Sequence, residues 1–130
     1  MQSSPPVEIA EPALLIRISQ LFRPGMSIAE LFEATRGVWK IGGDRDKVEY
    51  ALAVAGGVVQ EVYAVGAWQP AGTAEYLTRP RHDVEIDGRW EFTGGVAERV
   101  IRAKYIGQSV AHYFRKGAAN PFAYVNVKQQ

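Results

Sequence analysis

The chain has 130 residues and a formal net charge of +1, with 47% hydrophobic and 22% charged residues. This length is typical of one domain, and the balance of residue types is that of a globular protein. The absence of cysteine excludes disulfides and thiolate metal sites, and no apolar run is long enough to predict a transmembrane helix. We therefore expect a cytoplasmic protein that does not associate with a membrane.

The N-terminal part of the chain divides into a leader and the beginning of a domain. Residues 1–12 are rich in serine and proline and lack the basic start of a signal peptide. We predict a disordered leader over these residues and a single domain over residues 13–130. The apolar run at residues 14–18 predicts a first strand.

A helix is predicted after the turn at residues 23–25. Ser27 and Glu30 have the spacing of a capping box, in which each side chain accepts a hydrogen bond from the backbone amide of the other residue. We expect the helix to run to about Thr35 and to be ended by Gly37. The side chains expected to face the core are Ile28, Leu31 and Phe32.

Three strands are predicted next. Residues 38–41 predict a short strand. Two apolar, β-branched runs at residues 50–55 and 58–65 flank Gly56 and Gly57, and both glycines can adopt the positive φ of a tight turn. This pattern predicts a hairpin, and its second strand is apolar on much of both faces, so we expect it to be central in the sheet.

The second half of the chain is predicted to begin with a long loop, from Trp68 to Asp83. Further elements are expected, namely strands at residues 84–86, 89–93 and 122–127 and helices at residues 96–103 and 109–114. Six or seven strands, three short helices and no regular βαβ alternation predict an α+β fold. The sheet is expected to be mostly antiparallel, or a small, partly open barrel.

The near-zero net charge conceals an asymmetry along the chain. Residues 1–98 hold all 14 acidic residues and nine of the 15 basic ones, whereas residues 99–130 hold six basic residues and no acid. Such an asymmetry is typical of proteins that bind an acidic partner such as nucleic acid. Alternatively, folding brings the acids of the first part against these cations. The sequence leaves both interpretations open.

Cations and aromatic residues alternate in the C-terminal third, which is the combination that contacts phosphates and stacks on bases. The candidate phosphate-binding residues are Arg99, Arg102, Lys104, Arg115 and Lys116. The candidate stacking residues are Trp39, Trp68, Tyr105 and Tyr113, and Trp68 is expected to be the most exposed tryptophan. We expect no metal site and no cofactor, because the two histidines lie far apart and no phosphate-binding loop is present.

One segment resembles a nuclease signature. Tyr105-Ile106-Gly107 looks like the second half of the GIY-YIG motif, and Gly37-Val38-Trp39 is loosely similar to its first half. Arg115 stands where that family carries its catalytic arginine. The resemblance implies a metal-dependent nuclease in which Tyr105 helps to activate the attacking water and Arg115 stabilises the charge on the phosphate.

A longer stretch, residues 30–127, resembles a family of small uncharacterised bacterial proteins. The segments that carry the resemblance are residues 34–41, 50–63, 89–94 and 120–126. The family resembles companions of restriction and defence nucleases. The central hairpin and the chain length are also similar to those of PUA-like domains, which implies binding of modified bases or RNA.

These observations favour binding over catalysis. The leading hypothesis is a module that binds DNA or RNA, as an accessory to a defence or processing enzyme. A second hypothesis is a protein-interaction or dimerisation domain, in which the basic third docks an acidic protein and the hairpin pairs with a second copy. The third is the metal-dependent nuclease implied by the GIY-YIG resemblance.

Overall fold

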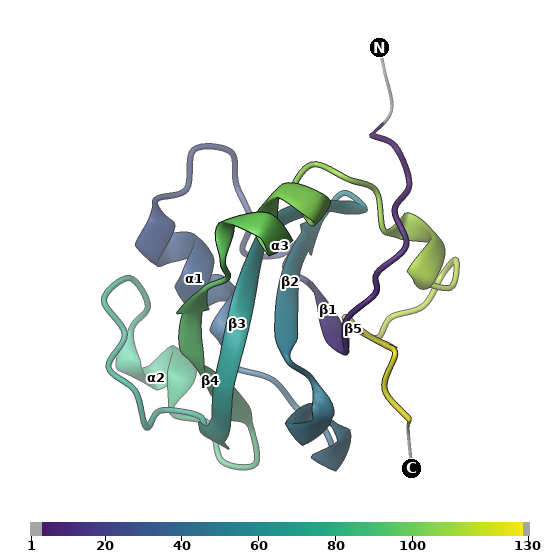
Figure 1. Cartoon of the computed structure of the whole chain (residues 1–130). Coiled ribbons are helices and arrows are strands. Elements are labelled where there is room, and N and C mark those ends of the chain that lie inside the picture. The colour runs from purple at the N-terminus through teal and green to yellow at the C-terminus, as the bar shows by residue number, and fades with distance from the viewer. Residues whose placement is uncertain (1–3, 129–130) are drawn as a thin grey trace.

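The computed structural model describes residues 4–128, which form a five-stranded sheet with a helix on each face (Figure 1). The strands are β1 (Ala13–Arg17), β2 (Tyr50–Ala55), β3 (Val58–Pro70), β4 (Trp90–Val96) and β5 (Phe122–Val125). The helices are α1 (Ile28–Arg36), α2 (Arg81–Val84) and α3 (Arg99–Tyr105), with 3-10 turns η1 (Gly43–Lys47) and η2 (Ala111–Tyr113).

The sheet is open and mostly antiparallel, in the order β4-β3-β2-β1-β5. Only β1 and β2 are parallel, and α1 lies in the connection between them. The other three pairs are antiparallel. The predicted α+β class and the mostly antiparallel sheet are therefore confirmed, and of the two predicted forms the open sheet is the one observed.

The sheet buries both of its faces because its inner strands are apolar at successive positions. In β1, Leu15 points into one apolar cluster, together with Tyr105 of α3. Leu14 and Ile16 point into the other cluster, against which Phe32 of α1 packs. Helices α3 and α1 therefore cover opposite faces of the sheet (Figure 1).

The predicted β2–β3 hairpin is confirmed, with φ of 60° at Gly56 and 77° at Gly57. Strand β3 lies between β2 and β4, so its predicted central position is also confirmed. It extends to Pro70, however, with a register shift between Val65 and Ala67. Strand β2 lies between β1 and β3, and β3 pairs with β2 through Val58–Ala64 and with β4 through Tyr63–Pro70.

The predicted capping box of α1 is present: Ser27 Oγ accepts from the Glu30 amide at 3.1 Å, and Glu30 accepts from the Ser27 amide at 3.0 Å. The expectation that Ile28 faces the core is wrong, since it is 82% exposed in the first turn. Gly37 follows the helix in an extended conformation. A Cβ at Gly37 would lie 2.7 Å from the Tyr76 hydroxyl, so close approach explains the glycine.

Several short elements differ from the predictions. Residues 38–41 form no strand, and only Trp39 makes a bridge, to Trp90. Residues 84–86 were predicted as a strand but form none, and Val84 is the last residue of α2. Asp83, predicted to lie in the long loop, lies in α2. The predicted helix at residues 109–114 is only the turn η2. Each of these segments is short, so tertiary contacts decide its conformation.

The predicted leader is ordered where the structure describes it, and Met1–Ser3 lie outside the described residues. The Val7 amide donates to the Ser109 carbonyl at 3.1 Å, and the Ser109 amide donates to the Pro5 carbonyl at 2.7 Å. Ile9 is buried in the cluster beneath α3. Residues 4–12 thus belong to the fold. Among residues 4–128, no helix is long and apolar enough to cross a bilayer.

Candidate functional site

Two of the three cations on α3 are paired with acids from distant segments. Arg102 donates to both carboxylate oxygens of Glu61, at 2.8 and 3.0 Å. Lys104 donates to Glu11 at 2.7 Å. Burial alone would raise the pKa of Glu11. Its hydrogen bonds with Lys104 and Tyr105 lower the pKa by more than burial raises it, so the pKa lies below the usual value. Arg99 is exposed and makes no ion pair with residues 4–128.

Tyr105, a candidate for both stacking and catalysis, is buried beneath α3 with only 1% of its surface exposed. Its hydroxyl donates to Glu11 and accepts from the Ala10 amide at 3.1 Å. The ring is therefore inaccessible for stacking on a base, and both polar functions of the hydroxyl are occupied. Arg115, its partner in the nuclease-like interpretation, is exposed after η2.

Two other candidate stacking residues have partners within the fold. Trp68 is part of β3, where its ring packs edge-on against Phe92 with the centroids 5.3 Å apart. It is half-buried, so it does not stand in an open loop as expected. Tyr113 is also half-buried; its hydroxyl accepts from the Ile9 amide at 2.9 Å and donates to Glu8.

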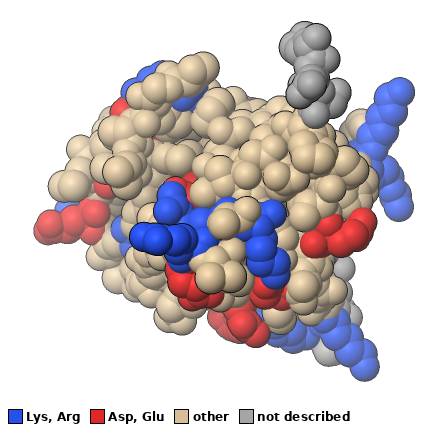
Figure 2. Space-filling model, turned by 45° about the horizontal axis from the view of Figure 1, so that its top comes forward, with Lys and Arg blue, Asp and Glu red and all other residues tan. Residues whose placement is uncertain are grey.

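The predicted phosphate-binding residues come from two different segments of the fold. On the face that includes α3, Lys and Arg side chains occur in separate groups with Asp and Glu beside them (Figure 2). Arg99, Arg102 and Lys104 lie on α3, whereas Arg115 and Lys116 lie in the loop between η2 and β5. Arg115 and Lys116 are exposed and have no ion-pair partner among residues 4–128.

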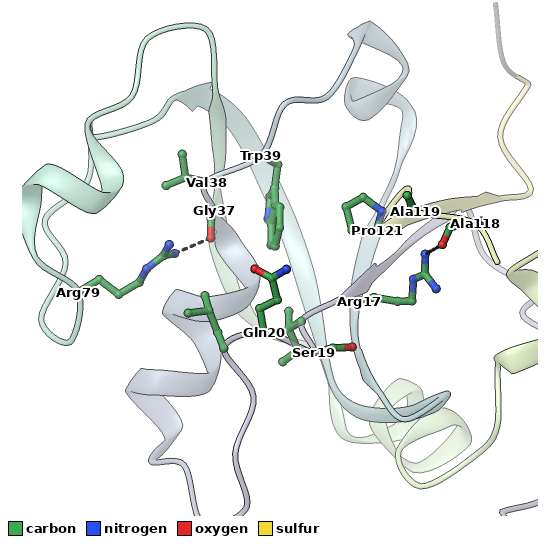
Figure 3. Close-up of a pocket in the computed structure, with 12 residues that line it drawn as sticks. Arg17, Ser19, Gln20, Gly37, Val38, Trp39, Arg79, Ala118, Ala119 and Pro121 are labelled. Carbon is green, nitrogen blue, oxygen red and sulfur yellow. Dashed lines mark hydrogen bonds between the residues drawn. The ribbon is translucent and has the colours of Figure 1, made fainter.

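A cavity of about 580 Å³ opens where β1 ends and the segment before β5 begins (Figure 3). We call it the Trp39 cavity. Its lining comes from the residues that follow β1, those that follow α1, the long loop and the segment before β5. These residues are Arg17, Ile18, Ser19, Gln20, Leu21, Gly37, Val38, Trp39, Arg79, Ala118, Ala119 and Pro121. The lining contains two arginines and no acidic residue.

Trp39 forms a fixed aromatic wall of this cavity. Its amide and carbonyl both pair with Trp90, at 2.9 and 2.8 Å. Its indole Nε1 donates to the Thr35 carbonyl at 2.8 Å. Phe122 packs edge-on against it, with the centroids 5.5 Å apart. Figure 3 shows the Gln20 side chain directed toward this indole. The ring is therefore held in place before any ligand binds.

Arg17 and Arg79 lie on either side of the cavity (Figure 3). Arg17 donates through one terminal nitrogen to the carbonyls of Ala118 and Asn120. Arg79 donates through one terminal nitrogen to the carbonyls of Glu33 and Gly37, at 2.9 and 2.6 Å. Within residues 4–128, neither guanidinium has a carboxylate partner. Both positive charges are fixed in place without being neutralised.

A buried carboxylate holds the part of the long loop that carries Arg79. Glu33 is 4% exposed and accepts from the amides of Leu77 and Thr78, both at 2.7 Å, and from the Thr78 hydroxyl at 2.6 Å. Burial alone would raise the pKa of Glu33. These hydrogen bonds lower the pKa by more than burial raises it, so the pKa lies below the usual value.

A second buried carboxylate, Glu91, holds the beginning of the same loop. It is fully buried and accepts from the Gln69 side chain at 2.6 Å, the Gly72 and Ala74 amides at 2.9 and 2.7 Å, and the Tyr76 hydroxyl at 3.0 Å. Burial raises the pKa of Glu91 and the hydrogen bonds lower it, with a net decrease. The two carboxylates thus bind loop amides and leave the arginines unpaired.

Most residues of the Trp39 cavity are absent from the sequence-based predictions. Trp39 is the only one of its lining residues that we predicted as a site residue, and Arg115 and Lys116 precede Ala118 in the adjacent loop. The signal that could have indicated Arg79 is its place in the long loop. Arg17 has no such signal, because it ends an apolar strand.

Among residues 4–128, no group of three or more His, Cys, Asp and Glu side chains is arranged to hold a metal ion. Comparison with protein-family models, curated proteins and solved structures finds no match to this chain.

Proposed function

We propose that this protein is a nucleic-acid-binding module, that it serves as an accessory to a defence or processing enzyme, and that it binds its ligand at the Trp39 cavity. One observation carries the proposal: the cavity has a fixed indole wall and two arginines without carboxylate partners, and its lining contains no acid. Aromatic faces and unpaired cations are what single-stranded nucleic acid requires of a protein surface.

The electrostatic part of the proposal depends on charge that is not already neutralised. A cation contributes to phosphate binding by releasing counterions from the nucleic acid, and a cation that is already paired contributes less. Arg102 and Lys104 are paired with Glu61 and Glu11. Arg17 and Arg79 are not paired, so they are better placed to attract phosphate.

Further cations are close in sequence to residues that line the cavity. Arg36, Lys40 and Lys116 lie within two residues of a lining residue, and Arg115 lies within three. Lys40 also lines a second cavity of about 390 Å³, next to Phe122 and Tyr124 of the edge strand β5. We propose that a strand runs from the Trp39 cavity along this edge. Trp39, Arg115 and Lys116 therefore remain in the proposed site.

A fluorescence titration tests the proposal. Single- and double-stranded DNA and RNA are added to the protein at about 50 mM and 200 mM salt, a range over which phosphate binding weakens steeply. We expect single strands to bind and the affinity to fall with salt. No binding of any nucleic acid at the lower salt concentration would contradict the proposal.

A matched pair of variants separates the cavity from α3. Arg79→Gln removes an unpaired charge of the cavity, and Arg99→Gln removes an unpaired charge of α3. We expect Arg79→Gln to weaken binding about tenfold, as for loss of a charge-assisted contact, and Arg99→Gln to leave it unchanged. The reverse result would assign binding to α3.

A further inference from the structure

The second cavity, beside the edge strand β5, repeats the chemistry of the Trp39 cavity. We call it the Tyr124 cavity. Its volumes and that of the Trp39 cavity, about 390 and 580 Å³, both lie within the range of pockets that bind small molecules. Each lining combines an aromatic wall with at least one cation and contains no acidic residue. The residues that line the Tyr124 cavity are Lys40, Ile41, Gly42, Tyr113, Asn120, Phe122, Ala123 and Tyr124.

The two cavities meet at one aromatic pair. Trp39 lines the first cavity, Phe122 lines the second, and their rings pack edge-on with the centroids 5.5 Å apart. Two chain segments also pass from one lining to the other. Trp39 is followed directly by Lys40 of the second cavity, and Pro121 of the first cavity is followed directly by Phe122. The cavities are therefore neighbours in the fold.

The aromatic side chains of the Tyr124 cavity come from both faces of the sheet. Phe122 and Tyr124 of β5 pack against the cluster beneath α1, whereas Tyr113 of η2 packs against the cluster beneath α3. All three side chains are half-buried, and the Tyr113 hydroxyl accepts from the Ile9 amide at 2.9 Å. The edge of β5 thus lies between rings that are packed in place, as Trp39 is in the first cavity.

The same chemistry at two neighbouring cavities is what a ligand with a repeating unit requires. A nucleic acid strand has one base and one phosphate in each unit, and proteins that bind single strands place successive bases on successive aromatic side chains. A single nucleotide would use only one of the two cavities. Lys40 is exposed where the cavities meet and has no ion-pair partner among residues 4–128.

Resting on the proposed function, we propose that the two cavities are subsites for two consecutive nucleotides of one strand. One base lies against Trp39, the next lies against Tyr124, and the phosphate that links them lies at Lys40. This phosphate is a diester with a single charge, so one lysine is sufficient to match it. Lys40 carries its charge on a flexible stem and can follow the phosphate. The smallest ligand that fills the site is then a dinucleotide.

A series of ligands of increasing length tests this inference. Calorimetry measures the binding of a nucleoside 5′-monophosphate, the corresponding dinucleoside monophosphate and strands of three to six nucleotides, with adenine and with thymine or uracil as the base. We expect the dinucleoside monophosphate to bind about tenfold or more tightly than the mononucleotide, because a second base stacks on an aromatic side chain. Each nucleotide beyond the second should add less, because it meets neither cavity.

Two adjacent glycines provide a matched pair of variants. Gly42 lines the Tyr124 cavity and Gly43 does not, and a Cβ added at either position meets no atom within 4 Å. Gly42→Leu should occupy the cavity and lower the ratio of dinucleoside to mononucleotide affinity to about one, whereas Gly43→Leu should leave the ratio unchanged. The ratio is an internal control, since a variant that fails to fold loses both affinities.

A change in the ligand tests the position of the linking phosphate. A methylphosphonate link has the same length but no charge. Lys40→Gln should weaken the binding of the normal dinucleoside monophosphate severalfold and leave that of the methylphosphonate ligand unchanged, because only the former has a charge to lose contact with. Equal effects on the two ligands would overturn the assignment of the phosphate to Lys40.

The outcomes separate this inference from the proposed function. If the affinity rises evenly with length, or if Gly42→Leu keeps the wild-type ratio, the inference is wrong and the proposed function stands. If the mononucleotide binds as tightly as every longer strand, or if no ligand binds, both are wrong. A step in affinity from one nucleotide to two that is lost in Gly42→Leu and kept in Gly43→Leu supports both.

Discussion

Helix α3 and the Trp39 cavity both present arginines, but the acidic side chains near them have different partners. Beside α3, Glu61 and Glu11 form ion pairs with Arg102 and Lys104. Beside the cavity, buried carboxylates accept hydrogen bonds mainly from amides and hydroxyls of the long loop, and Arg17 and Arg79 donate to backbone carbonyls. The distribution of charge along the sequence favours α3, whereas the pairing seen in the fold favours the cavity.

The difference shows that a buried carboxylate can support a cationic site without neutralising it. An acid that accepts several backbone hydrogen bonds stays ionised at neutral pH and fixes a loop. Glu33 does this for Leu77 and Thr78, next to Arg79 in the chain. The same side chain placed beside the guanidinium would have cancelled its charge.

The largest expected effect concerns the stability of the cavity side. Glu91→Gln replaces an acceptor of four hydrogen bonds by a group that also donates, so a buried N–H or O–H loses its partner. We expect the free energy of unfolding to fall by about 2–3 kcal/mol, as for a buried hydrogen bond to a charged group. Urea unfolding measures it.

The control for this prediction is Glu75→Gln, at an exposed position in the same loop. It should leave the urea midpoint almost unchanged. Equal stability of Glu91→Gln and the wild type would show that this carboxylate does not hold the loop.

A pH series sharpens the same comparison. The folded pKa values of Glu33 and Glu91 lie below the usual 4.5, so their contribution to stability is complete above that value and is lost as the pH falls below it. Thermal unfolding from neutral to acidic pH should show a larger loss for the wild type than for Glu91→Gln. Parallel curves for the two proteins would contradict this expectation.

An intermediate effect is expected from the loop between η2 and β5. Replacing Arg115 and Lys116 together by alanine should weaken single-strand binding severalfold. It should also lower the slope of log affinity against log salt by about one for each phosphate that is no longer neutralised. The matched control is Arg99→Ala, another exposed cation without an ion-pair partner among residues 4–128. An unchanged slope in the double variant would remove this loop from the proposed site.

The smallest effect is expected on α3 itself. Glu61→Gln removes the ion-pair partner of Arg102 and so increases the positive charge of α3. The pair is bidentate and the Glu61 side chain is largely buried, so the melting temperature should fall modestly, and the affinity is compared where both proteins are folded. If nucleic acid binds at the cavity, the affinity should stay the same. If it binds on α3, the affinity should rise, because a cation has been released from its carboxylate.

Local patterns allowed much of the fold to be predicted. The Ser27–Glu30 capping box and the Gly56-Gly57 turn act over a few residues, and both are present as expected. The ordered segment at residues 4–12 could not be predicted, because its hydrogen bonds reach Ser109 and its buried Ile9 depends on the cluster beneath α3. Such contacts have no signature in the segment itself.

The site was predictable only in part, for the same reason. Trp39 was named from its residue type, and the cations at Arg115 and Lys116 from composition. Arg17 and Arg79 line the same cavity, from opposite sides, only because the fold places the end of β1 opposite a loop fixed by buried carboxylates. Nothing in their own neighbourhoods indicates that either remains without a carboxylate partner.

Binding at the Trp39 cavity, and not on α3, can be tested by a map of amide chemical shifts in the ¹⁵N-labelled protein during titration with a short single strand. We expect the largest changes around the cavity, at residues 17–21, 37–40, 79 and 115–120, while residues 99–104 of α3 change little. The largest changes at residues 99–104, with residues 17–21 and 37–40 unaffected, would contradict binding at the cavity.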